Sequence, residues 1–221
     1  MAKLVSFRGV YSADRAAALS GVPKSTIYYW AKKGIYLPSV SPTREKLWSY
    51  SDLLGLRAVY WLRQDKPDAA RTTMRNVRQA LSDASELGIP FEALDLSVDR
   101  GGSVLYRHPE DGQLRRPGGQ VVLEEPLRQL QLLVEYSAGG RLGPNLKRPR
   151  AHLMILPGKL SGEPHIRGTR IATSHIAALA RSGVALDEIR LLYPSLGDQP
   201  QSIQEAVSLE EQLASNLKQA A

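Results

Sequence analysis

The chain contains no cysteine, and this absence removes several classes of chemistry. Without thiols there is no disulfide framework, thiolate zinc site, thiol nucleophile or thiol redox switch. No segment of the 221 residues is apolar over the length that spans a bilayer, and the N-terminus lacks an apolar core of signal-peptide length. With 43% apolar and 23% charged residues, the composition is typical of a soluble globular protein. We therefore expect a cytoplasmic protein with no membrane contact.

Recognisable metal-binding and catalytic patterns are also missing. The four histidines, at positions 108, 152, 165 and 175, form no His-x-x-His or His-Glu-x-x-His pattern, so we expect no metal. Gly158 and Lys159 are followed by leucine, where a phosphate-binding loop needs serine or threonine. No nucleophile is paired with a base in a recognisable arrangement. We expect no enzyme activity and no cofactor.

The positive charge is concentrated at the start of the chain. Residues 1–66 hold eleven Lys and Arg against four Asp and Glu, a net charge of +7, which equals that of the whole chain. Residues 67–150 carry +1 and residues 151–221 carry −1. Such a concentration in one small region favours a nucleic-acid partner for that region alone.

Two short helices joined by a tight turn are predicted near the N-terminus. Ser12 is a typical N-cap for the first helix, and Gly21 is a typical end. Pro23 suits the first turn of a second helix over 24–33, which Gly34 closes.

A basic hairpin over 38–48 and a third helix over 51–64, capped by Ser51, follow. The order helix, turn, helix, basic hairpin and helix predicts a winged helix-turn-helix domain over 1–66.

The second helix divides into two faces. Ile27, Trp30 and Ala31 form an apolar stripe, and polar, aromatic and basic residues project on the other side. A recognition helix needs short hydrogen-bonding residues near its start to reach base edges, and Lys or Tyr beside them to hold phosphates. We therefore predict that this helix and the hairpin bind DNA through Lys24, Ser25, Thr26, Tyr28, Tyr29, Lys32, Lys33, Arg44 and Lys46.

The rest of the chain is predicted to be a mixed region and a helical one. Residues 67–150 should form a long helix over 68–88, a small β region, a short helix over 127–136 and a Gly/Pro/Arg-rich connector. The predicted strands lie at 94–98, 104–106 and 121–123. Residues 151–221 should form a short hairpin and three helices, the first capped by Thr173. The predicted fold class is mostly α with a small β element: winged helix-turn-helix, α/β middle region and three-helix C-terminal domain.

The loop over 157–171 is rich in glycine and proline and carries Lys159, Arg167 and Arg170. Its glycines can simply satisfy tight turns in a strand-turn-strand lid, an interpretation that the residues alone favour. The same loop can also present guanidinium groups to a partner's carboxylates or to a phosphate.

Two segments resemble known families. The run Ala16-Ala-Ala-Leu-Ser-Gly-Val-Pro-Lys-Ser-Thr-Ile-Tyr-Tyr-Trp30, followed by Trp48-Ser-Tyr-Ser-Asp-Leu53, resembles the MerR-like winged helix-turn-helix, in which the second helix enters the major groove. The run Leu156-Pro-Gly-Lys-Leu-Ser-Gly-Glu-Pro-His-Ile-Arg-Gly-Thr-Arg-Ile171, with Gly183, Tyr193-Pro194 and Ile203-Gln-Glu-Ala206, closely resembles the domain family of unknown function number 433. That family is a three-helix unit after a short hairpin and recurs in antitoxins encoded beside PIN-domain ribonuclease toxins.

Together the two resemblances imply a VapB-like antitoxin of a type II toxin–antitoxin pair. Such a protein would repress its own operon by binding operator DNA, and its C-terminal region would neutralise a VapC-like PIN-domain ribonuclease toxin. The implied toxin-binding residues are Lys159, His165, Arg167, Thr169 and Arg170. We also expect a homodimer, because one small helix-turn-helix buries little DNA surface. Typical VapB antitoxins are far shorter and use other DNA-binding domains.

Two other classes of function remain open. The chain is also compatible with a MerR-like transcriptional regulator whose middle and C-terminal regions sense a small molecule or a protein. A third possibility is a protein-interaction module in which the basic domain has lost its role.

Overall fold

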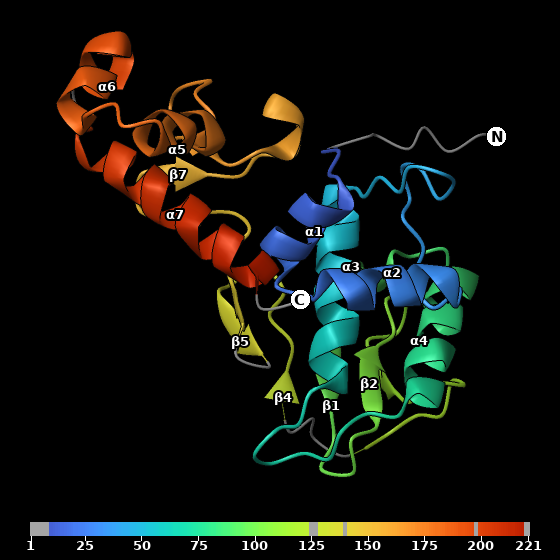
Figure 1. Ribbon diagram of the computed structural model, residues 1–221. Coiled ribbons are helices and arrows are strands. Elements are labelled where there is room, and N and C mark those ends of the chain that lie inside the picture. Colours follow the sequence, from blue (N-terminus) through green and yellow to red (C-terminus); the bar gives the residue numbers. More distant parts are fainter. Residues whose placement is uncertain (1–8, 124–127, 139–140, 197–198, 219–221) are drawn as a thin grey trace. The chain divides into compact units, whose positions relative to one another are not determined.

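A computed structural model describes residues 9–123, 128–138, 141–196 and 199–218 (Figure 1). As predicted, the protein is mostly helical with small antiparallel sheets. It divides into two compact units, of which unit 1 comprises residues 1–53 and 133–221 and unit 2 comprises residues 54–132. Both ends of the chain therefore contribute to one unit. No helix within the described residues is long and apolar enough to cross a membrane.

The helix-turn-helix lies in unit 1 and forms as its local signals predict. Helix α1 spans Ala13–Ser20, and the Ser12 side chain accepts the N–H of Arg15 at 3.3 Å. Gly21 ends it with φ of +73°, in the left-handed region that glycine adopts without strain. Helix α2 spans Lys24–Lys32 after Pro23. Its predicted apolar stripe is confirmed, because Ile27, Trp30 and Ala31 are all buried.

The third helix, α3 (Tyr50–Arg63), begins two residues earlier than a cap at Ser51 predicts. Ser49, rather than Ser51, is the residue whose hydroxyl accepts the N–H of Asp52, at 3.1 Å. The Asp52 carboxylate in turn accepts the N–H groups of Ser49 and Ser39 at 2.7 and 2.9 Å. Burial raises the pKa of Asp52, against these hydrogen bonds, which lower it.

The predicted basic hairpin is present as a hairpin loop over residues 41–47. Ser41 and Leu47 exchange both backbone hydrogen bonds, at 3.1 and 3.0 Å. Trp48 then exchanges both of its backbone bonds with Tyr11, at 2.9 and 2.8 Å. The loop is thereby held beside the start of α1.

The C-terminal part of unit 1 contains the predicted hairpin and three helices. Strands β7 (Leu153–Met154) and β8 (His165–Ile166) pair antiparallel, and helices α5 (Thr173–Arg181), α6 (Leu186–Leu192) and α7 (Gln201–Lys218) follow. The short 3₁₀ turns η2 (Leu160–Gly162) and η3 (Pro194–Leu196) lie in the loops. Strands β5 (Tyr136–Ala138) and β6 (Arg141–Gly143) form a second small sheet.

Thr173 does not cap α5 as predicted. It is the first helical residue, and the Ala172 that precedes it offers no side-chain acceptor. The Thr173 hydroxyl instead lies near the Pro164 carbonyl, at 3.3 Å, and the Glu210 carboxylate, at 2.5 Å. These tertiary partners take the place of a local cap.

Unit 2 packs helix α4 (Met74–Glu86) with a four-stranded antiparallel sheet of order β3-β2-β1-β4, and the 3₁₀ turn η1 (Phe91–Ala93) links them. The strands are β1 (Leu96–Val98), β2 (Val104–Arg107), β3 (Leu114–Arg115) and β4 (Arg128–Gln129). The first two confirm the predicted strands. Val121, predicted to lie in a third strand, makes only an isolated bridge to Arg115.

Two predicted helices of the middle region need correction. Helix α4 starts at Met74 rather than at residue 68, because Thr73 caps it by accepting the N–H of Asn76 at 3.2 Å. The helix predicted over 127–136 is wrong. Residue 127 lies outside the described residues, but Arg128–Gln129 pairs with β1 and Tyr136 begins β5. This segment pairs with the edge of β1 as a strand instead of forming a helix.

Candidate nucleic-acid interface

The polar face of α2 consists of Ser25, Tyr28, Tyr29, Lys32 and Lys33, and all five residues are exposed. The exposed fractions of Tyr28 and Tyr29 are 44% and 54%, high for aromatic residues. Their exposure follows from the burial of Ile27, Trp30 and Ala31 on the opposite side of the helix. The helix therefore presents two phenol rings and two ammonium groups to solvent along one side.

The hairpin loop brings further predicted residues close to this face. A cleft of about 560 Å³ is lined by Tyr28 of α2, by Arg44 and Lys46 of the hairpin loop, and by the first turn of α1. Arg44 is exposed, and the Lys46 ammonium donates to the Thr43 carbonyl at 3.3 Å. Residues of α1, of α2 and of the hairpin loop thus surround one opening.

Lys24 has a different environment from the other lysines of α2. Its Nζ lies 2.6 Å from Oδ1 of Asp14, on α1, and 5.9 Å from the centre of the Tyr28 ring. The hydrogen bond to Asp14 raises the pKa of Lys24. Thr26, next along the helix, is half-buried. The start of α2 therefore carries a neutral ion pair rather than a free cation.

Several other basic residues of the first 66 are engaged within the protein. Arg57 donates to the Leu132 carbonyl, Arg63 to that of Thr72, and Lys66 to those of Trp61, Leu62 and Gln64. Among the described residues, Lys32, Lys33 and Arg44 have neither an ion-pair partner nor a side-chain hydrogen bond. Lys3 and Arg8 lie outside the described residues. The cations available to a polyanion are far fewer than the sequence count suggests.

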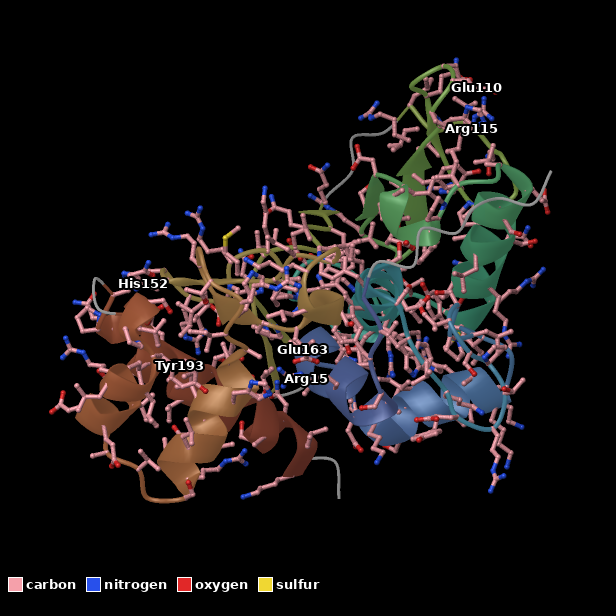
Figure 2. All side chains as sticks on the ribbon, turned by 90° about the horizontal axis from the view of Figure 1, so that it is seen from above. Arg15, Glu110, Arg115, His152, Glu163 and Tyr193 are labelled. Carbon is pink, nitrogen blue, oxygen red and sulfur yellow. The ribbon has the colours of Figure 1, made fainter. Side chains whose placement is uncertain are left out.

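Arg15 is the most heavily engaged basic residue of the helix-turn-helix. Its guanidinium lies 2.7 Å from Oε2 of Glu163 and 2.8 Å from Oε2 of Glu210, and it forms paired hydrogen bonds with each carboxylate. Figure 2 shows Arg15 and Glu163 side by side. Burial raises the pKa of Glu210, but these contacts together outweigh it, so that the pKa is lowered. We call these three residues the Arg15 cluster.

Tyr11 strengthens the same junction. Its hydroxyl donates to the Gly162 carbonyl at 2.8 Å, and Val10 N–H donates to the Ser161 carbonyl at 3.0 Å. Gly162 has φ of +83°, and a Cβ there would lie 2.1 Å from the Tyr11 hydroxyl. The 160–163 segment therefore fits directly against the start of the helix-turn-helix.

The predicted toxin-binding residues separate into exposed and internal ones. Arg167 and Arg170 are exposed at the end of a tight turn over 166–171, which we call the arginine tip. Thr169 forms this turn, because its hydroxyl donates to the Ile166 carbonyl at 2.9 Å and accepts the N–H of Ile171 at 3.1 Å. No described side chain pairs with either arginine.

His165 and Lys159 are less accessible to solvent than the two arginines. His165 is fully buried, and its Nδ1 is 3.0 Å from the Glu163 carbonyl, so that nitrogen carries the proton and donates. Burial lowers the pKa of His165. Lys159 is half-buried. Of the five predicted toxin-binding residues, only Arg167 and Arg170 are exposed.

Sequence reasoning missed the Arg15 cluster and the Asp14–Lys24 pair. The sequence signal for the second was present, since Asp14 stands in the first turn of α1 and Lys24 at the start of α2. The Arg15 cluster had no local signal, because its members are 148 and 195 residues apart. No group of three or more His, Asp or Glu among the described residues could hold a metal ion.

Comparison with known proteins gives a family match. Residues 154–208 match a family described as protein of unknown function (DUF433). The match covers about a quarter of the chain, from the end of β7 through η2, α5 and α6 into α7. No curated protein and no solved structure matches the chain.

Proposed function

We propose that unit 1 binds operator DNA through the polar face of α2 and the hairpin loop, and that the protein thereby represses its own operon. The observation that carries this proposal is the separation of the two faces of α2. One face is buried, and the other displays Tyr28, Tyr29, Lys32 and Lys33, the two lysines having no partner among the described residues. Arg44 lines the same cleft as Tyr28.

This arrangement suits the chemistry of duplex DNA. Short polar and aromatic groups near the start of a helix can meet base edges in the major groove, and lysines farther along it can contact phosphates. A cation on a neighbouring loop adds a phosphate contact that fixes the register of the helix. A homodimer would place two such helices on paired half-sites and raise specificity.

The test is DNA binding by the full chain to a fluorescent duplex taken from upstream of its own gene. Lys32→Ala with Lys33→Ala should weaken binding at least tenfold, because each lost phosphate contact removes a released counterion. The matched control is Arg75→Ala with Arg78→Ala, which removes the same charge from two exposed residues of α4. An equal loss in both double variants would contradict the assignment to α2.

We further propose that the C-terminal part of unit 1 binds and neutralises a VapC-like PIN-domain ribonuclease. The arginine tip favours this function, since it lies within the DUF433 match and exposes two guanidinium groups. Guanidinium groups pair with carboxylates in bidentate geometry, and the metal-binding site of such a toxin is acidic.

Co-expression with the neighbouring toxin gene tests this second function. Arg167→Ala with Arg170→Ala should abolish the protection of growth, whereas Arg190→Ala, an exposed arginine of α6, should preserve it. Full protection by the double variant would remove the arginine tip from the toxin interface. DNA binding without any protection by the wild-type chain would favour a MerR-like regulator that senses another signal.

A further inference from the structure

The proposed DNA interface contains an acidic residue, Asp14, that is paired with a lysine of α2. Asp14 lies in the first turn of α1, and its side chain is 56% exposed. It lines the same cleft as Tyr28, Arg44 and Lys46. A carboxylate in this position repels phosphate groups, so its presence calls for an explanation other than affinity for the DNA backbone.

Asp14 pairs with the first residue of α2, the proposed recognition helix. Its Oδ1 holds the Lys24 ammonium at 2.6 Å, and the ammonium lies over the Tyr28 ring. The pair is therefore neutral as a whole, although Lys32 and Lys33 at the other end of α2 remain free to contact phosphates. The two ends of the helix face differ in charge.

A neutral lysine–aspartate pair is suited to bases rather than to phosphates. In the major groove a carboxylate accepts a hydrogen bond from the exocyclic amino group of a base, most often that of cytosine. Oδ2 of Asp14 has no hydrogen-bond partner among the described residues, so an acceptor is available beside the ion pair. The first residues of a recognition helix are those that reach base edges.

We propose that Asp14 is a specificity-determining residue that accepts a hydrogen bond from a base amino group and restrains Lys24 from phosphate contact. This inference rests on the proposed DNA binding. Asp14 thereby lowers the affinity for DNA in general and raises the preference for one base pair.

The experiment compares Asp14→Asn with the wild-type chain on two duplexes. One duplex is selected by the wild-type protein from a randomised pool, and the other has an unrelated sequence of equal length. The variant should bind the unrelated duplex more tightly, with a salt dependence steeper by about one unit because Lys24 is released to a phosphate. The ratio of the two affinities should fall by about tenfold, the discrimination that one base contact supplies.

Glu45→Gln is the matched control. Glu45 is exposed, lines the same cleft and has no cation partner among the described residues. Its removal changes the charge of the cleft by the same amount, so it should raise both affinities together and leave their ratio unchanged.

Selection repeated with Asp14→Asn gives an independent readout. The variant should select a site that differs from the wild-type site at one base pair and agrees elsewhere. An unchanged ratio and an unchanged selected site would overturn the role of Asp14 while DNA binding itself stands. A loss of binding to both duplexes with unchanged thermal unfolding would also overturn it, and a wild-type chain that binds no duplex would refute the proposed function as well.

Discussion

Two groups of basic side chains in unit 1 are used in opposite ways. Arg15 is only 18% exposed and is held by two carboxylates, whereas Lys32, Lys33 and Arg44 are exposed with no ion-pair partner among the described residues. All four contribute equally to the net charge of residues 1–66. The difference teaches that a concentrated positive charge in a sequence overstates the surface available to a polyanion, because partners from distant segments neutralise part of it.

The C-terminal segment also has a structural role in the helix-turn-helix. Both carboxylates of the Arg15 cluster come from it, and Asn216 of α7 donates to the Ala18 carbonyl of α1 at 3.3 Å. The segment thus supports the first helix of the helix-turn-helix, independently of any partner that it binds. The following variants separate this supporting role from the exposed cations.

The largest effect is expected from Arg15→Ala. Its removal leaves Glu163 and Glu210 partly buried without their cation, and breaking such a pair from one side costs about 3–5 kcal/mol of folding free energy. Urea unfolding of the full chain measures this cost. Arg44→Ala, which removes an exposed arginine with no partner among the described residues, should change the free energy of unfolding by less than about 0.5 kcal/mol. Equal effects of the two substitutions would abolish the distinction between the groups.

Gly162→Ala should have the next largest effect. A Cβ at this position meets the Tyr11 hydroxyl at 2.1 Å, and φ of +83° strains any other residue. We expect destabilisation by about 2–3 kcal/mol, from the clash and the left-handed backbone together. Gly158→Ala in the same loop is the control, since its Cβ would have nothing within 4 Å. Similar unfolding midpoints for the two variants would contradict the tight fit of this segment against Tyr11.

A smaller, pH-dependent effect is expected from Glu210→Gln. The pKa of Glu210 in the folded protein is lowered from its ordinary value of 4.5. The ionised carboxylate therefore contributes stability above pH 4.5, and this contribution is lost as the pH falls through the lowered pKa. The variant should be less stable than wild type by about 1–3 kcal/mol at pH 7, and the gap should shrink at acidic pH. A gap that is constant from pH 7 to pH 3 in urea unfolding would exclude an ionic role.

Local signals were sufficient to predict the helix-turn-helix. Ser12 and Gly21 bound α1, and the apolar spacing of Ile27, Trp30 and Ala31 fixed the buried face of α2, because caps and periodicity act over a few residues. The candidate DNA-binding face could therefore be proposed from sequence. The difference in charge between the two ends of this face could not be predicted, since the Asp14–Lys24 pair depends on how α1 and α2 pack.

Long-range pairing explains what the sequence did not reveal. Residues 128–136 contain apolar side chains compatible with a helix, but the free edge of β1 offers unpaired backbone groups that Arg128 and Gln129 satisfy. In the Arg15 cluster, Glu163 is 148 residues and Glu210 is 195 residues from Arg15 in the sequence, and no spacing rule applies at such separations. Both outcomes were decided by tertiary partners rather than by local propensity.

The most direct test of the central claim is the salt dependence of DNA binding, measured with a duplex short enough to hold one chain. If only Lys32, Lys33, Arg44 and Lys46 contact phosphates, log K should fall against log salt with a slope of about −4. The Lys32→Ala, Lys33→Ala variant should reduce the slope to about −2. A slope of about −8 would show that the internally paired cations also contact DNA. A slope near zero would show that the α2 face does not bind DNA electrostatically, and either result would contradict the account.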